Sequence, residues 1–68
     1  MTLGLGEFLK RHRINAGLTL DELSQLSGIT ITALWNAENG KNKPYAKTII
    51  RLAKILKFDE TEVFKTYY

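Results

Sequence analysis

Residues 19–40 decide the fold of this chain, and they read TLDELSQLSGITITALWNAENG. Thr19 with Glu22 three residues later is a capping box, which marks the first turn of a helix. Ser27-Gly28 ends that helix after about two turns, because glycine readily adopts the left-handed backbone of a sharp turn. Thr30 is an N-cap for a second helix, from residue 31 to about residue 39. The segment predicts two short helices joined by a turn of about three or four residues.

The flanking sequence predicts three more helices and has no alternating strand pattern of useful length. The first extends from residue 4 or 5 to residue 16, where Gly17 stops it. A later helix covers residues 46–57 and follows Pro44, which keeps residues 41–44 in a loop. Asp59 with Glu62 forms a second capping box and opens a short last helix. We therefore expect an all-α fold of five helices in one domain spanning residues 1–68.

Three- and four-residue spacing selects the apolar positions that line the core. In the helix after Thr19, Leu23 and Leu26 are the expected core residues. The first, fourth and fifth helices contribute the apolar residues Leu5, Phe8, Leu9, Ile49, Leu52, Ala53, Leu56, Val63 and Phe64, with His12 as a candidate on the same face as Phe8.

The chain lacks the residues from which most enzyme active sites and metal centres are built. Its 68 residues contain no cysteine and one histidine, His12, which stands between Arg11 and Arg13. A lone imidazole between two cations makes neither a zinc site nor a convincing general base. We expect no catalytic residues, no metal, no cofactor and no enzymatic activity.

Charge is unevenly distributed, although the net charge is a modest +3. Residues 41–57 carry six basic side chains and no acid, whereas residues 18–38 carry three acids and no lysine or arginine. Such a basic run indicates either a nucleic-acid partner or an ordinary solvated helix face. No apolar stretch approaches the roughly 18 residues that span a bilayer. The N-terminal residues 1–6 do not resemble a signal peptide, so we expect a cytoplasmic protein without a membrane partner.

The spacing within residues 19–40 is typical of two helices that cross steeply and leave one side of the second helix exposed. A helix of that size fits the major groove of B-DNA, with its N-terminal residues nearest the base edges. An ordinary helical hairpin would have the same spacing, so spacing alone leaves both interpretations open.

Several short stretches occur in a characteristic order along the chain. They are LGEFLKRHR at residues 5–13, GLTLDELS at 17–24, SGIT at 27–30 and ENGK at 38–41, followed by Pro44, Ile49, residues 52–54 and Leu56. In this order the sequence, from Leu5 to about Phe64, resembles the lambdoid phage repressor and Cro-like (XRE-type) helix-turn-helix family. The resemblance implies a DNA-binding transcriptional regulator, typically a repressor, of bacterial or phage origin. It also implies that operator DNA is bound by a weak or DNA-assisted homodimer.

The resemblance assigns roles to residues of this chain. The base-reading positions of the second motif helix correspond to Ile31, Thr32, Trp35 and Asn36. The phosphate-binding positions correspond to Asn39, Gly40, Lys41 and Lys43. The helix N-terminus at Thr19 is a further phosphate site, because its free N–H groups and the helix dipole favour an anion. Arg13 and Glu38 match a structural ion pair between the first and third helices, so Arg13 is not expected to contact DNA. The core matches are Leu23, Ile29, Leu34, Ala37, Leu52 and Leu56, and Ser24 replaces the usual alanine.

Three apolar residues depart from the family pattern. Leu20 stands where the family often has a glutamine, and Ile31 and Trp35 occupy positions that are often polar. Together they are expected to form an exposed patch, which is typical of a protein-binding surface. The alternative function is therefore a protein-interaction module, either an antirepressor, an antitoxin-like partner or an adaptor. Trp35 has a third reading, in which it lies against a neighbouring helix and stabilises the fold.

Two further groups have open readings. Lys47, Arg51 and Lys54 lie opposite the apolar stripe of their helix, so they form either a solvated face or a phosphate-binding one. Tyr67 and Tyr68 are expected either to be disordered or to contribute to a dimer interface.

Overall fold

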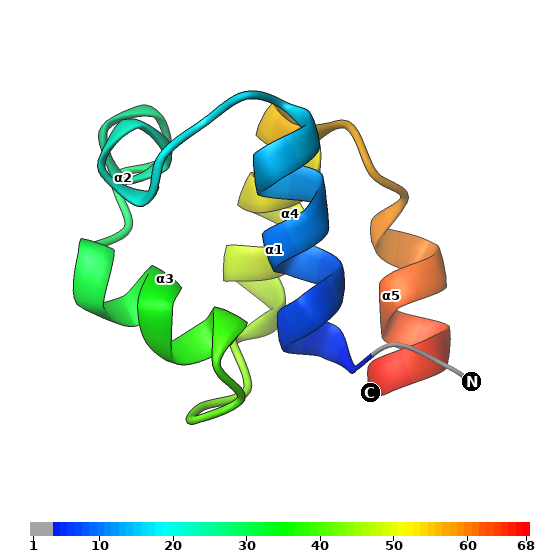
Figure 1. The fold of residues 1–68 in the computed structure, drawn as a ribbon. Helices are drawn as coiled ribbons and strands as arrows, with labels where there is room; N and C mark the ends of the chain where they lie inside the picture. The colour runs from blue at the N-terminus through cyan, green and yellow to red at the C-terminus, as the bar shows by residue number, and fades with distance from the viewer. Residues whose placement is uncertain (1–3) are drawn as a thin grey trace.

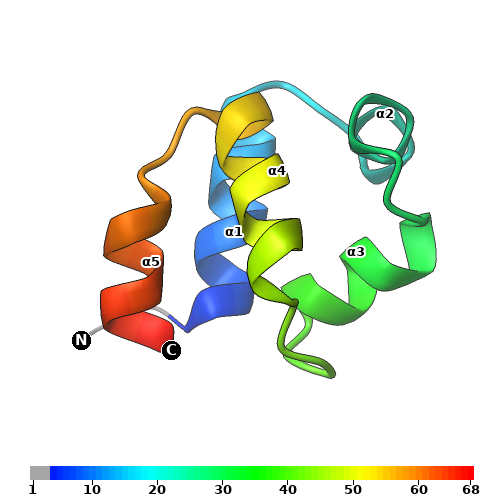
Figure 2. The ribbon, with the colours of Figure 1, turned by 180° about the vertical axis from the view of Figure 1, so that it is seen from behind.

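The computed structural model describes residues 4–68, which form five helices: α1 (Leu5–Asn15), α2 (Leu20–Ser27), α3 (Ile31–Glu38), α4 (Ala46–Leu56) and α5 (Glu60–Tyr67). No strand occurs within this range, so the all-α prediction is confirmed. The helices α2 and α3 lie at one end of the molecule and α5 at the other, with α1 and α4 between them (Figure 1, Figure 2). Residues 1–3, part of the stretch in which no signal peptide is expected, lie outside the described residues.

Side-chain caps set the beginnings of α2, α3 and α5. The Thr19 hydroxyl accepts from the Glu22 amide at 3.1 Å, and the Glu22 carboxylate accepts from the Thr19 amide at 2.9 Å, which completes the predicted capping box. The Thr30 hydroxyl accepts from the Ala33 amide at 3.1 Å. Asp59 differs from prediction, because its carboxylate accepts from the amide of Thr61 and so caps one residue earlier than a capping box would.

One core is shared by all five helices. The buried apolar side chains are Leu9, Leu23, Leu34, Ala37, Ile49, Leu52, Ala53, Leu56, Phe58 and Val63. Within the described residues, none of the helices is long and apolar enough to cross a membrane. On the α5 side, Phe8 meets Phe58 edge to face with ring centroids 5.2 Å apart, and His12 lies 4.4 Å from the Phe8 ring. His12 therefore serves as a packing residue in an aromatic cluster.

The prediction for Leu26 is wrong, because this side chain is 61% exposed. At about 100° per residue, Leu20, Leu23 and Ser27 point the same way along α2, and Leu26 lies to one side of them. Ser27 takes the inward position and is buried, and its hydroxyl accepts from the Ile29 amide. Leu20 is half-buried against the core, so it does not belong to the exposed patch expected from the sequence.

Candidate nucleic-acid interface

The helix α3 presents one face to the core and the opposite face to solvent. Leu34 and Ala37 are buried, whereas Thr32 and Trp35 are exposed and Asn36 is half-buried. The helical repeat of about 100° per residue groups Thr32, Trp35 and Asn36 on the outward side. Ile31, at the first turn, is 45% exposed, and Trp35 is 47% exposed. Two members of the expected apolar patch therefore remain accessible beside the polar Thr32 and Asn36.

The turn between α2 and α3 is held by side chains as well as by its backbone. Gly28 adopts the left-handed conformation with φ of 73°. The Ser24 hydroxyl donates to the Ile29 carbonyl at 2.5 Å, which gives this serine a role that the usual alanine lacks. The Arg51 guanidinium of α4 donates to the Ser27 carbonyl at 3.2 Å. Arg51 thus stabilises the turn from α4. Neither a solvated face nor a phosphate-binding face, the two roles expected from the sequence, includes this contact.

An ion pair attaches α1 to the last residue of α3. The Arg13 Nε and Nη2 atoms donate to the two Glu38 carboxylate oxygens at 2.6 and 3.0 Å, and Nη1 donates to the Leu18 carbonyl at 2.9 Å. The side chains are 12% and 5% exposed, respectively. The hydrogen bond to Glu38 raises the pKa of the Arg13 guanidinium, so Arg13 stays charged. The two bonds to Glu38 join α1 to the exposed helix α3, and the bond to Leu18 joins α1 to the connection before α2.

The backbones of α1 and α3 approach closely at Gly6. A methyl group added to Gly6 would overlap the Glu38 carbonyl oxygen and lie 2.8 Å from the Ala37 carbonyl oxygen. Sequence reasoning assigned no role to Gly6, although a glycine inside a helical pattern costs about 1 kcal/mol relative to alanine and so indicates a packing requirement. Gly6 and the Arg13–Glu38 pair together fix α3 against α1.

Most hydrogen-bond donors at the expected phosphate positions already have partners within the chain. The Thr19 amide is bound by Glu22, and the hydrogen bond from this amide lowers the pKa of the Glu22 carboxyl. The Asn39 side-chain amide donates to the Trp35 carbonyl at 2.8 Å. The Gly40 and Lys41 amides donate to carbonyls of α3. The Gly40 and Lys41 amides would have to exchange partners before they could bind phosphate. The Asn39 side-chain amide keeps a second N–H, and the Thr19 hydroxyl, which accepts from Glu22, keeps its own proton to donate.

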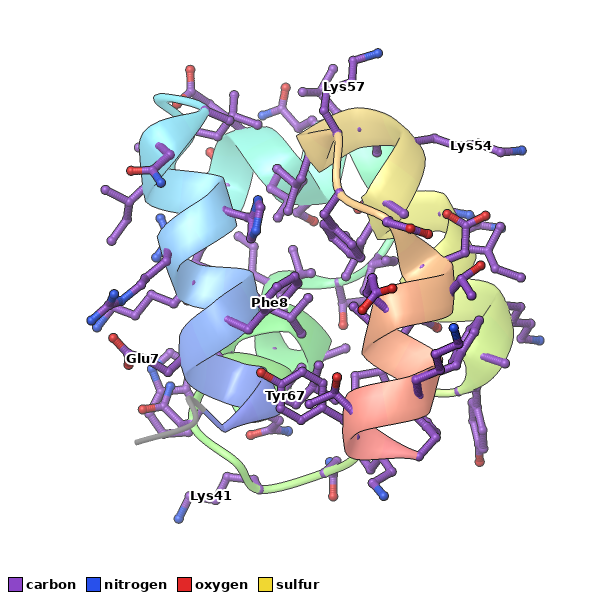
Figure 3. All side chains as sticks on the ribbon, turned by 90° about the vertical axis from the view of Figure 1, so that its right-hand side faces the viewer. Glu7, Phe8, Lys41, Lys54, Lys57 and Tyr67 are labelled. Carbon is purple, nitrogen blue, oxygen red and sulfur yellow. The ribbon has the colours of Figure 1, made fainter. Side chains whose placement is uncertain are left out.

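The lysines of the basic run point in different directions. Lys41 extends away from the body of the protein, on the side opposite Lys54 and Lys57 at the far end of α4 (Figure 3). The Lys43 ammonium donates to the Tyr67 carbonyl of α5 at 2.9 Å. The basic run therefore does not form one continuous surface, and Lys41, which follows the end of α3 by three residues, extends into solvent.

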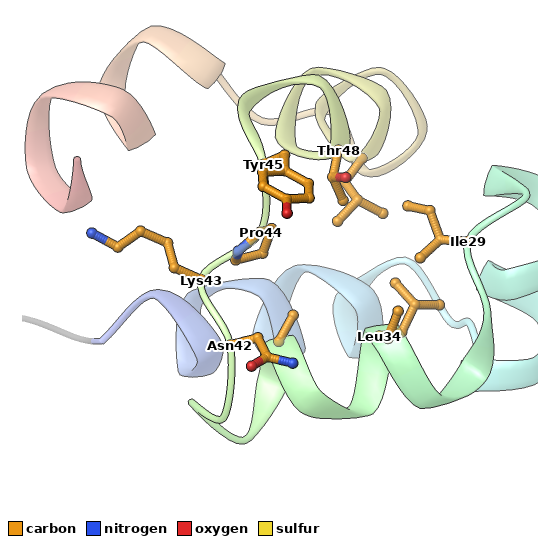
Figure 4. Close-up of a pocket in the computed structure, with 10 residues that line it drawn as sticks. Ile29, Leu34, Asn42, Lys43, Pro44, Tyr45 and Thr48 are labelled. Carbon is orange, nitrogen blue, oxygen red and sulfur yellow. The ribbon is translucent and has the colours of Figure 1, made fainter.

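A groove of about 470 Å³ lies beside α3 (Figure 4). One wall consists of Ile29 and of Ala33, Leu34 and Ala37 from α3, and the other of residues 42–45 with Thr48 and Leu52. The loop at residues 42–45 therefore forms the wall of the groove that faces α3.

Comparisons with known proteins agree with this architecture. The family described as "Helix-turn-helix domain" matches residues 6–68. A solved complex of the SinR and SinI proteins superposes with a TM-score of 0.83 at 19% identity, covering 91% of this chain and 61% of that chain. A transcriptional regulator of the HTH_3 family from Vibrio cholerae gives a TM-score of 0.78 at 30% identity, covering 90% of this chain and 34% of that chain. No curated protein matched the sequence.

These coverages mean that the chain spans less than two thirds of either solved chain. The match to the family extends from α1 to α5 and includes the exposed helix and the ion pair that orients it. The chain therefore belongs to the helix-turn-helix domain family, of the Cro-like (XRE) type that its sequence resembles.

Proposed function

We propose that this chain is a transcriptional regulator that binds double-stranded DNA, inserts α3 into the major groove and represses by occupying its site. The observation that supports this most directly is the outward face of α3, which carries Thr32, Trp35 and Asn36 while Leu34 and Ala37 hold the helix on the core. A helix presented in this way fits the major groove and brings side chains to the base edges. The V. cholerae relative is described as a transcriptional regulator, which agrees with this proposal.

Within this proposal each outward residue of α3 makes a different kind of contact with the bases. The Asn36 amide pairs with adenine, and the Thr32 hydroxyl bonds to a base or its methyl contacts thymine. Ile31 and Trp35 supply apolar contacts, for which the thymine methyl is the natural partner. Lys41 neutralises a phosphate beside the major groove of the DNA. Thr19 and Asn39 donate to phosphates through their remaining hydroxyl and amide protons, and the Gly40 amide contributes after exchanging its present partner.

A symmetric dimer on a two-fold operator completes the proposal. Two copies of α3 would read half-sites about one helical turn, roughly 34 Å, apart. A symmetric pair of binding helices matches a pseudo-palindromic site. Selection from a random duplex library at physiological salt tests this directly, because it recovers a two-fold motif if the dimer binds.

Asn36→Ala is expected to weaken binding to the selected site by about 1–3 kcal/mol, because it removes a bidentate contact to one base. Binding to unrelated DNA should change little, since phosphate contacts supply non-specific affinity. The measurement is a fluorescence-anisotropy titration of wild type and variant on both duplexes.

Asn15→Ala serves as the matched control, because Asn15 is an exposed asparagine at the end of α1. It should leave both affinities unchanged. Equal losses on the selected and unrelated duplexes for Asn36→Ala would contradict a base-reading role for Asn36.

The exposure of Ile31 and Trp35 favours a second candidate function, a protein-interaction module. If α3 reads DNA, Trp35→Ala should weaken binding to the selected duplex by about fivefold or more through the lost apolar contact. If α3 binds a protein instead, the wild type should enrich no motif, and Trp35→Ala should abolish the protein complex without changing DNA binding. Wild type and Trp35→Ala are each titrated on the selected duplex and on any protein partner, and the affinity that Trp35→Ala lowers distinguishes the two functions.

A further inference from the structure

Three contacts join the loop after α3 to the end of α5. The Lys43 ammonium donates to the Tyr67 carbonyl at 2.9 Å and lies 4.9 Å from the centroid of the Tyr68 ring. The Tyr68 hydroxyl donates to the Pro44 carbonyl at 2.5 Å. We call these four residues, Lys43, Pro44, Tyr67 and Tyr68, the α5 clasp. Figure 4 shows Lys43 pointing out of the groove and toward the last turn of α5.

The α5 side of the clasp is itself anchored in the fold. The Tyr67 ring lies 5.9 Å from Phe8 of α1, and the two side chains face each other across the gap between α1 and α5 (Figure 3). The Tyr68 ring meets Phe64 edge to face at 5.3 Å. Both tyrosines therefore pack against the fold, which disagrees with the first of their two sequence-based readings, a disordered end.

Electrostatics stabilises the contacts that Lys43 and Tyr68 make in the clasp. The carbonyls of the last helical turn carry partial negative charge, which favours a lysine ammonium beside them. The face of an aromatic ring attracts the same cation. Partial burial raises the pKa of the Tyr68 phenol, so its hydroxyl remains a proton donor at neutral pH.

The clasp holds the loop that follows Lys41. Residues 42–45 line the groove beside α3, and besides the clasp the Tyr45 carbonyl accepts from the Thr48 and Ile49 amides of α4. Lys41 immediately precedes this loop and extends into solvent (Figure 3). A loop that is ordered before binding loses less conformational entropy when it meets DNA.

We propose that Tyr68 and Lys43 are positioning residues, which tie the loop to α5 so that Lys41 is presented to a DNA phosphate while Lys43 itself makes no phosphate contact. This inference rests on the proposed function, and it revises the role that the family resemblance implied for Lys43. The α5 clasp then acts on DNA affinity from outside the binding surface.

The salt dependence of DNA binding distinguishes a lysine that contacts phosphate from a lysine that positions the loop. Each lost phosphate contact reduces the slope of log K against log[salt] by about 0.9. When a positioning contact is lost, Lys41 still reaches the phosphate but its loop loses more conformational entropy on binding. Binding then weakens at every salt concentration, and the slope stays unchanged because the number of phosphate contacts is the same. Phosphate contacts dominate non-specific binding, so a labelled duplex of random sequence is a sufficient probe.

The experiment compares wild type, Lys41→Gln, Lys43→Gln and Tyr68→Phe on that duplex over a series of salt concentrations. Lys41→Gln should reduce the slope by about 0.9. Lys43→Gln and Tyr68→Phe should weaken binding by about threefold to tenfold with the wild-type slope, a range that corresponds to one hydrogen bond. Tyr68→Phe keeps the aromatic ring and removes the hydroxyl, so it isolates the bond to Pro44.

The possible results separate the clasp from the proposed function. A slope change for Lys43→Gln equal to that of Lys41→Gln would make Lys43 a phosphate ligand and overturn the inference. Unchanged affinity for Tyr68→Phe would overturn it as well. If the wild type shows no salt-dependent binding, the proposed function itself fails. Thermal unfolding of each variant, followed by circular dichroism, shows that affinities are compared between folded proteins.

Discussion

Arg13→Met is expected to lower the free energy of unfolding by about 3–5 kcal/mol, a large part of the stability of a domain of this size. The substitution leaves the Glu38 carboxylate, whose side chain is 5% exposed, without its guanidinium partner. It also removes the donor to the Leu18 carbonyl, so the connection between α1 and α2 loses a contact. Urea unfolding followed by circular dichroism measures the loss, and complete unfolding in the absence of urea is the extreme result.

Two controls make this prediction specific to the buried pair. Arg11→Met breaks the exposed pair with Glu7, in which the side chains are 62% and 51% exposed and 3.5 Å apart, and it should cost well under about 1 kcal/mol. The double substitution Arg13→Met with Glu38→Leu should recover much of the loss, because apolar replacement of a buried pair is often close to neutral. If Arg13→Met costs no more than Arg11→Met, the pair does not anchor α3.

Gly6→Ala is expected to destabilise the domain by about 2–3 kcal/mol, although alanine is the better helix former by about 1 kcal/mol. The added methyl meets the Ala37 and Glu38 carbonyl oxygens, and both are backbone atoms that cannot rotate away. The two helices must therefore separate, which disturbs the ion pair next to them. The midpoint of urea unfolding checks this prediction.

Gly4→Ala is the matched control, since nothing lies within 4 Å of a methyl group added there. It should change stability much less than Gly6→Ala. Equal effects of the two substitutions would show that helix propensity or capping, rather than the close approach at Gly6, determines the result.

Local signals explain why the helices could be predicted from the sequence. Thr19 and Thr30 cap their helices through bonds to amides three residues away, so both partners lie within one short stretch. Leu26 was predicted wrongly because a helix of eight residues makes about two turns, which is too short for the spacing of Leu20, Leu23 and Leu26 to select one inward direction. Buried Ser27 satisfies its hydroxyl at Ile29, a possibility that hydrophobic patterning does not consider.

Long-range partners explain what the sequence did not reveal about the site. Arg51 and Lys43 each bond to a carbonyl 24 residues away in the chain, and charge patterning does not identify such an acceptor. Gly6 did carry a signal, since an isolated glycine inside a helix indicates close packing, but the partner helix is visible only in the fold. The base-reading assignments of Ile31, Thr32, Trp35 and Asn36 remain predictions.

The lengths of the helices have a consequence for how the protein unfolds. They contain between 8 and 11 residues, which is shorter than the roughly 12–15 residues at which isolated helices become even marginally stable in water. The α3 segment should therefore have no helical form outside the assembled domain, and its amides should exchange with solvent mainly through global opening. Cellular proteases would meet the same opened state. The half-life of the protein and its folded fraction would then rise and fall together.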